Sequence, residues 1–222
     1  MQYRLLGRTG ISVSTLCLGG GVLGTRWGNL DVEDSARVVH AALDAGINFV
    51  DTADAYEESE VYLGKALRGH RDDVVLTSKV NNRLGTGVND GGNSKRWIKR
   101  AVENSLRRLQ TDHLDLYQVH RPEPNTDIDE TLSALTDLVR EGKVLHIGTS
   151  TFSGAEIVEA EWVADRRGRA GSPPPRCRTR CSIAAPRPRS CPRPRSTASA
   201  SSPSARWPAE CSPTPGRVAG TR

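Results

Sequence analysis

The chain has 222 residues and a formal net charge of +5, and its charged residues are unevenly distributed. Residues 1–165 hold 18 basic and 25 acidic residues, a net charge of −7, whereas residues 166–222 hold thirteen Arg, no Lys and one Glu, a net charge of +12. No apolar stretch approaches the roughly 20 residues of a membrane-spanning helix and no signal peptide precedes the first strand-like run, so we expect a cytoplasmic protein without membrane contact.

Residues 13–160 alternate between short apolar runs and stretches with the period of an amphipathic helix. The runs predicted as strands are VSTLCLGG, INFVDTA, VVLTSKV, LDLYQVH and VLHIGTS. Strands that alternate with helices predict a parallel sheet with right-handed crossovers, because each helix returns the chain to the start of the next strand.

The helical stretches have recognisable ends and apolar faces. The first is predicted to begin after Asp31, an N-cap residue, and to end at Gly46. Its apolar stripe consists of Val32, Ala36, Val39 and Leu43. The stretch SKRWIKRAVENSLRRL places on one face Ile98, Val102, Leu106 and Leu109. The stretch DETLSALTDLVREGK does the same with Leu132, Leu135 and Val139.

Polar residues stand at the carboxyl ends of four consecutive predicted strands: Asp51, Lys79, His120 and Ser150. A doubly wound sheet concentrates its site at one switch point, whereas a (β/α)8 barrel collects polar groups from many strands on one rim. We therefore predict the α/β class and a (β/α)8 TIM barrel. Residues 1–165 supply only about five strand–helix units of it, so the predicted barrel is incomplete.

Asp51, Tyr56, Lys79 and His120 form a set with a clear chemical logic. A phenol with an ordinary pKa near 10 is a poor proton donor at neutral pH, and an adjacent ammonium lowers a phenol's pKa. A carboxylate holds such an ammonium in place, and an imidazole orients a substrate carbonyl. Together these groups can protonate a carbonyl oxygen while a hydride reaches its carbon.

Each of these residues alone has an ordinary explanation. An aspartate that ends a strand is usually a cap or turn residue, a single lysine is most often a surface charge, and His120 beside a proline-containing turn can simply end a strand. Their coincidence at successive strand ends favours a site. The remaining histidines have no such setting and are interpreted as surface or packing residues: His40, His70, His113 and His146.

The segments DTADAY, LTSKV, LDLYQVH and HIGTS, with the phrase RRLQTDHLDLYQVHRP, resemble the aldo-keto reductase superfamily over about residues 3–165. The resemblance implies a (β/α)8 barrel that reduces aldehydes or ketones, with NADPH as the hydride donor and a small-molecule carbonyl compound as substrate. It assigns the general acid to Tyr56, the tuning of that acid to Lys79 and Asp51, and the orientation of the carbonyl to His120. Because some barrels of this family regulate partner proteins, a non-catalytic cofactor-binding subunit is the alternative.

The resemblance also implies cofactor contacts, at Gly20, Gly21, Asp51, Ser150 and Thr151. Ser150 corresponds to the segment that contacts the nicotinamide carboxamide, and Thr151 stands where many members carry asparagine. The stretch GGGVLG formally fits a dinucleotide-binding fingerprint, but TRWGNL separates it from the next predicted helix, whose N-terminus that fingerprint requires. We therefore predict a loop at the barrel rim, in which Gly20 and Gly21 allow close approach to the cofactor. The stretch NNRLGTGVNDGGNS is predicted to be a solvated loop, with a substrate-facing role as the alternative.

Residues 166–222 form an Arg-, Pro- and Ser-rich tail without helical or strand periodicity, and we predict it to be disordered. Its arginines suggest non-specific attraction to phosphate, but no nucleic-acid partner is expected. Its cysteines lack the spacing of paired metal-binding knuckles, so no metal site is predicted: Cys177, Cys181, Cys191 and Cys211.

We hypothesise that the tail is a frameshift product. The codons GGC ATC GGC GTC ATC CCC encode an apolar strand, Gly-Ile-Gly-Val-Ile-Pro, and loss of the first base yields the Ala-Ser-Ala-Ser-Ser of residues 198–202, followed by a proline codon. The slip would lie between about residues 165 and 172. The chain as written then lacks part of the cofactor site, and the alternative to an active enzyme is an inactive fragment.

Overall fold

The computed structural model describes residues 1–24 and 28–168. The chain divides into two units, Met1–Pro186 and Arg187–Arg222, and the second lies entirely outside the described residues. Residues 169–222 of the tail that was predicted to be disordered also lie outside the described residues. Its first three residues belong to the last described helix, α5 (Gly154–Gly168), so helical structure extends past the predicted boundary at 165. No helix in the described part of the chain is long and apolar enough to cross a membrane.

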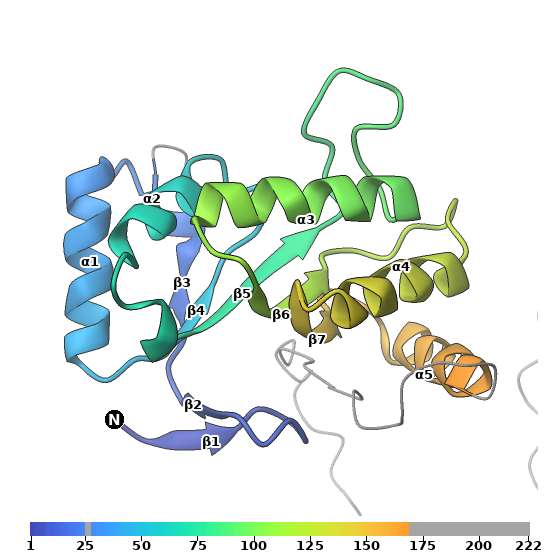
Figure 1. Cartoon of the computed structure of the whole chain (residues 1–222), viewed down its shortest axis with the longest axis horizontal. Coiled ribbons are helices and arrows are strands. Elements are labelled where there is room, and N and C mark those ends of the chain that lie inside the picture. Colours follow the sequence, from blue (N-terminus) through green and yellow to red (C-terminus); the bar gives the residue numbers. More distant parts are fainter. Residues whose placement is uncertain (25–27, 169–222) are drawn as a thin grey trace, which may run out of the picture. The chain divides into compact units, whose positions relative to one another are not determined.

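The central element of the described residues is a parallel five-stranded sheet (Figure 1). Its strands are β3 (Leu18–Gly19), β4 (Phe49–Asp51), β5 (Val75–Val80), β6 (Leu114–Val119) and β7 (Val144–Thr149). They lie side by side in the order in which they occur along the chain, so no described pair of strands reverses the order as a doubly wound sheet would. The predicted incomplete (β/α) barrel of about five units is confirmed.

The helices between these strands are α1 (Val32–Asp44), α2 (Ser59–Ala66), α3 (Lys95–Leu109) and α4 (Ile128–Arg140). Asp31 caps α1 as predicted, because its carboxylate accepts a hydrogen bond from the amide of Asp34 at 2.8 Å. Gly46 ends this helix with a φ of 82°, a conformation that glycine adopts without steric cost. In α4 the buried face is turned slightly from the predicted one, since Leu138 is fully buried whereas Leu132 and Val139 are half-buried.

The outer face of the sheet packs against these helices and forms the larger hydrophobic core. The strands contribute Val50, Leu76, Tyr117 and Val144. The helices contribute Val39, Leu63, Ile98, Val102, Leu106, Leu109, Ala134, Leu135 and Leu138. All four apolar residues predicted on the face of α3 are therefore in this core.

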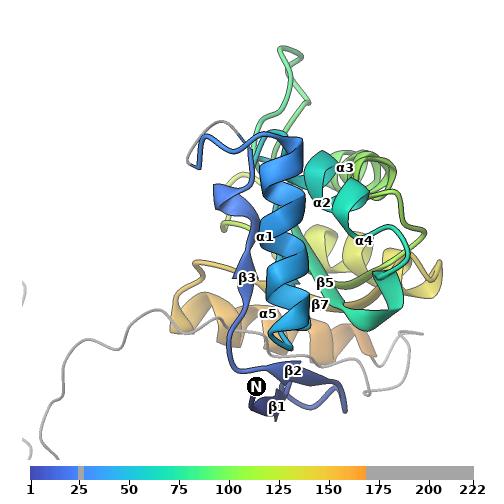
Figure 2. The same ribbon diagram turned by 90° about the vertical axis from the view of Figure 1, so that its left-hand side faces the viewer.

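The inner face of the sheet is apolar at its amino end and polar at its carboxyl end, because alternate residues of a strand point to the same face. Phe49, Val75 and Leu116 form a second core with Leu6 and Val13. The latter two come from the N-terminal segment, in which β1 (Tyr3–Leu5) and β2 (Ser12–Ser14) pair as an antiparallel hairpin (Figure 2). The hairpin thus covers the apolar end of the inner face, and the polar side chains lie toward the opposite end.

A polar cluster is buried behind the sheet, where α2 and α3 meet. Glu60 is fully buried, and its carboxylate accepts hydrogen bonds from Ser78 and from Arg108, both at 2.6 Å. Asp54 lies close by with 4% of its surface exposed. Burial raises the pKa of Asp54 from 3.8 to about 7 and the Glu60 carboxylate acts in the same direction, whereas Arg108 and two backbone amides oppose them. Asp54 therefore ionises near neutral pH.

We predict that Asp54→Asn stabilises the protein at alkaline pH. The folded state binds the Asp54 proton more tightly than the unfolded state, so stability is fully present below the unfolded pKa of 3.8 and is lost as the pH rises through about 7. Asparagine avoids the buried charge, and the variant should be more stable at pH 8 by at most about 4 kcal/mol. Urea denaturation at pH 5 and pH 8 measures this difference. Asp44→Asn, on an exposed residue, is the control, and an equal response of both variants would contradict the prediction.

Thr151 follows β7 with a φ of 58°, in the left-handed region. This conformation is unfavourable for a β-branched residue, whereas asparagine adopts it more readily. The Thr151 hydroxyl donates a hydrogen bond of 2.8 Å to the backbone oxygen of His120, which joins the ends of β7 and β6. The position therefore combines backbone strain with a stabilising contact.

We predict that Thr151→Asn raises the free energy of unfolding by about 1 kcal/mol, because asparagine relieves the strain of the left-handed backbone. Thr151→Val retains the strain and loses the hydroxyl that bonds to His120, so it should lower that free energy by about 1 kcal/mol. Thermal and urea denaturation of both variants test the pair. A destabilising asparagine would show that the hydroxyl contact outweighs the backbone strain.

Candidate active site

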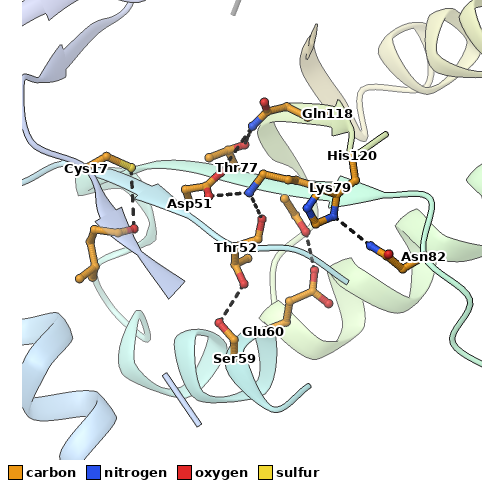
Figure 3. A network of polar contacts seen from close by, with 12 residues as sticks. Cys17, Asp51, Thr52, Ser59, Glu60, Thr77, Lys79, Asn82, Gln118 and His120 are labelled. Carbon is orange, nitrogen blue, oxygen red and sulfur yellow. Dashed lines mark hydrogen bonds and ion pairs between the residues drawn. The ribbon is translucent and has the colours of Figure 1, made fainter. Parts of the chain in front are cut away.

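The site is built around an ion pair between Lys79 and Asp51. The Lys79 ammonium donates to Asp51 Oδ2 at 2.5 Å and to the backbone oxygen of Thr52 at 2.9 Å (Figure 3). These groups meet because β4 and β5 are adjacent parallel strands that end at the same edge of the sheet. Burial raises the pKa of Asp51, while the nearby ammonium and the Gln118 amide oppose that effect.

Gln118 is a residue of the site that the sequence analysis missed. Its side-chain amide donates to Thr77 Oγ1 at 3.0 Å and to Asp51 Oδ1 at 3.4 Å, so both carboxylate oxygens of Asp51 have a donor (Figure 3). A signal was present in the sequence, since Gln118 precedes His120 by two positions and therefore points to the same face of β6. A fully buried glutamine in a strand indicates a polar partner inside the sheet.

Tyr56 and His120 lie beside the ion pair. The Lys79 ammonium is 5.1 Å from the centre of the Tyr56 ring, and the rings of Tyr56 and His120 meet edge to face with centroids 5.8 Å apart. Tyr56 sits in the tight turn that follows β4, where its amide donates to the backbone oxygen of Ala53 at 3.1 Å. The short, small-residue segment between Asp51 and Tyr56 thus folds back so that the Tyr56 ring lies near Lys79 at the end of β5.

His120 carries no positive charge at neutral pH. Burial lowers the pKa of its imidazole from 6.5 to about 4, and the positive charges of Lys79 and Arg121 act in the same direction. Its Nδ1 atom lies 3.0 Å from the side-chain nitrogen of Asn82 (Figure 3). Asn82 was also missed, because it lies in the polar loop that the sequence analysis predicted to be solvated.

The predicted cofactor-binding residues occupy three places, and one of them, Asp51, ends β4 in the ion pair with Lys79. Ser150 is half-buried directly after β7, where its amide donates to the backbone oxygen of Val119 at 2.8 Å, and Thr151 follows it. Gly20 and Gly21 lie in the short 3-10 helix η1 (Gly20–Val22) after β3. A Cβ on Gly20 would lie 2.7 Å from Ser59 Oγ and 2.9 Å from the backbone oxygen of Asp51, so close packing already accounts for glycine there.

The other four histidines make local contacts at other places. His40 Nε2 is 2.9 Å from the backbone oxygen of Ala66, and the imidazoles of His70 and His113 pair with aspartates near them in sequence. His146 is half-buried in β7, opposite Leu116 of β6. In the described residues, no cluster of three or more His, Cys, Asp or Glu side chains could hold a metal ion.

The arrangement brings a phenol, an ammonium held by a carboxylate, and a neutral imidazole to the carboxyl ends of three adjacent strands. An ammonium beside a phenol stabilises the phenolate that remains after proton transfer. A neutral imidazole with a protonated nitrogen can donate a hydrogen bond to a carbonyl oxygen. The geometry therefore suits the delivery of a proton to a carbonyl oxygen.

Comparison with known proteins gives several extensive similarities. The chain is 43% identical over 163 residues to the aldo-keto reductase YhdN of Bacillus subtilis, covering 69% of this chain and 48% of that protein. It is 37% identical over 171 residues to a probable voltage-gated potassium channel subunit beta of Arabidopsis thaliana, covering 75% of this chain and 51% of that protein. The chain thus spans about half the length of these curated relatives.

A solved structure and a family model agree with these relatives. The structure of the aldo-keto reductase AKR11C1 from Bacillus halodurans, in its holo form, is similar with a TM-score of 0.65 and 41% identity, over 72% of this chain and 53% of that one. The model of the Aldo/keto reductase family matches residues 15–171, which include all five strands of the sheet and the four side chains at its carboxyl edge. The chain therefore belongs to the aldo/keto reductase family.

Proposed function

We propose that the protein is an oxidoreductase that reduces aldehydes or ketones to alcohols by hydride transfer from NADPH. The observation that carries this proposal is the contact of Lys79 with both Asp51 and the ring of Tyr56, beside a neutral His120. Membership of the aldo/keto reductase family supports the reaction class. A small-molecule carbonyl compound is the proposed substrate.

Four side chains of this protein would carry out the proton transfer to the carbonyl oxygen. Tyr56 is the proposed general acid that protonates the carbonyl oxygen, and the Lys79 ammonium stabilises the resulting phenolate. Asp51 keeps that ammonium in position, since it accepts its hydrogen bond at 2.5 Å. His120 would hold the carbonyl oxygen through a ring N–H, because its low pKa leaves the imidazole uncharged at neutral pH.

NADPH would supply the hydride when bound. The hydroxyl groups of Ser150 and Thr151, directly after β7, fit the nicotinamide end of such a cofactor. Ser150 is half-buried next to the polar end of the inner face and presents a hydroxyl, a group that can bond to a carboxamide. Thr151 is exposed beside it, whereas Gly20 and Gly21 follow β3, at the opposite edge of the described five-stranded sheet. We propose these residues as cofactor contacts.

A second candidate function is cofactor binding without catalysis. It is favoured by the 37% identity to a probable voltage-gated potassium channel subunit beta, a protein named for its association with a channel. A regulatory protein of this kind would bind NADPH at the same residues and contact a partner protein. Measurements of binding and turnover on the same preparation separate the two functions.

We predict that Tyr56→Phe lowers the turnover of a simple aldehyde with NADPH by about 10²–10⁴-fold, the usual contribution of a general acid. Cofactor binding should stay unchanged, because phenylalanine retains the ring beside Lys79 and removes only the hydroxyl. NADPH oxidation followed by absorbance and cofactor binding followed by fluorescence measure the two effects. Tyr62→Phe, on a half-buried tyrosine of α2, is the matched control and should leave turnover unchanged.

Three outcomes would count against the enzyme proposal. Equal turnover by the wild type and Tyr56→Phe would remove Tyr56 as the acid. Binding of NADPH without turnover in the wild type would favour the regulatory function. A wild-type chain with neither binding nor turnover would favour the inactive fragment, and the nucleotide sequence around codons 160–175 would then show whether a single-base slip precedes the tail.

A further inference from the structure

We propose that Asn82 is a positioning residue that holds the His120 imidazole in the tautomer with its proton on Nε2. The Asn82 side-chain nitrogen is 3.0 Å from His120 Nδ1 (Figure 3). An amide nitrogen is only a donor, so its partner on the ring must be the unprotonated nitrogen. The remaining ring nitrogen then carries the proton of the neutral imidazole, and Nε2–H can donate a hydrogen bond to the substrate carbonyl.

Asn82 is held in place by an unusual backbone conformation at the residue before it. Asn81 has a φ of 149°, which is rare for any residue other than glycine and costs about 1–3 kcal/mol. The Asn81 backbone oxygen accepts a hydrogen bond from the amide of Gly92 at 2.7 Å, and its side chain donates to Asn93 Oδ1 at 3.0 Å. These contacts hold the conformation at the point where the chain leaves β5 and turns the Asn82 side chain to His120.

The same contacts tie this loop to the segment that follows His120. Asn93 is buried, and its side chain donates to the backbone oxygen of Arg121 at 3.0 Å. The backbone amide of Asn93 donates to the Glu123 carboxylate at 2.5 Å. These hydrogen bonds fix the two ends of the loop relative to the segment that follows β6. They therefore also fix the distance between Asn82 and the His120 imidazole.

The charges around the ring make an amide a better partner than a carboxylate. Lys79 and Arg121 are the cationic groups that act on His120, and both favour the neutral ring. An aspartate at position 82 would instead accept a hydrogen bond from Nδ1–H and favour the imidazolium or the opposite tautomer. The neutral donor at Asn82 thus keeps the ring uncharged and leaves Nε2 as the protonated nitrogen.

The proposal gives Asn82 a part in the proposed carbonyl reduction, but its test does not use activity. The full chain labelled with ¹⁵N-histidine is examined by long-range ¹H–¹⁵N spectra, which distinguish the two ring nitrogens by their couplings to the ring carbon protons. His120→Gln identifies the His120 signals among those of the five histidines. In the wild type at pH 7 we expect a protonated Nε2 and an unprotonated Nδ1.

Asn82→Asp is the decisive variant, because it replaces the donor by an acceptor of nearly the same shape. We expect its Nδ1 to become protonated and the His120 pKa to rise by about 1–3. Asn89→Asp adds the same charge at an exposed position of the same loop and should leave both nitrogens unchanged. Asn82→Ala removes the donor without adding charge and should shift the two nitrogen signals toward the values of mixed tautomers.

Two results would overturn the proposal. A wild-type spectrum with the proton on Nδ1 would show that the Asn82 amide oxygen accepts the bond, and this result requires no variant to fold. Equal spectra for the wild type and a folded Asn82→Asp, as judged by circular dichroism, would show that Asn82 does not set the tautomer. Failure of the carbonyl reduction itself would leave these spectra unaffected, so the two proposals are tested separately.

Discussion

The buried ion pair of Lys79 and Asp51 is the interaction on which the rest of the site depends. Their side chains are only 4% and 15% exposed, so the two charges have exchanged water for each other and for a few polar neighbours. Loss of one partner from such a pair leaves an uncompensated charge and typically costs about 3–5 kcal/mol. The structure satisfies the pair with the backbone oxygen of Thr52 on the ammonium and the Gln118 amide on the carboxylate. The protein thus bears the free-energy cost of burying these two charges at the place where the ammonium lies near the ring of Tyr56.

The two cores explain how a charged pair can be buried at this place. Helices α1 to α4 and the outer face of the sheet form the larger core, which fixes the strands relative to one another. On the inner face, the N-terminal hairpin packs on Phe49, Val75 and Leu116, so the apolar layer lies at the amino ends of the strands. Because side chains alternate along each strand, the same face carries polar groups two or four residues later. The inner face is thus divided into an apolar end and a polar end.

Hydrogen bonds between loops orient the groups that the strands deliver. Strand ends alone place His120 near Lys79, but the direction of its ring is set by Asn82 from the neighbouring loop. Asn93 joins that loop to the segment after β6, and Thr151 joins the end of β7 to the backbone of His120. Each of these residues occupies a loop with strained or irregular backbone, where side-chain amides and hydroxyls supply the bonds that regular structure would otherwise provide.

Local patterns in the sequence determined four of the five predicted strands, three of the helices and the convergence of Asp51, Lys79 and His120, because strand periodicity and parallel order bring carboxyl ends to one edge. The prediction of a single strand over VSTLCLGG was wrong, because its first residues pair with β1 in the antiparallel hairpin and only Leu18–Gly19 joins the parallel sheet. The apolar face of α3 was predicted residue by residue, because residues three or four positions apart share one face of a helix. Only the tertiary structure decided the partners of Gln118, the contact of Asn82 with His120, and the burial of Asp54 beside Glu60. Their importance arises from contacts between segments distant in sequence, such as Glu60 with Arg108, and no local period encodes which polar side chain will meet which partner once the helices have packed on the sheet.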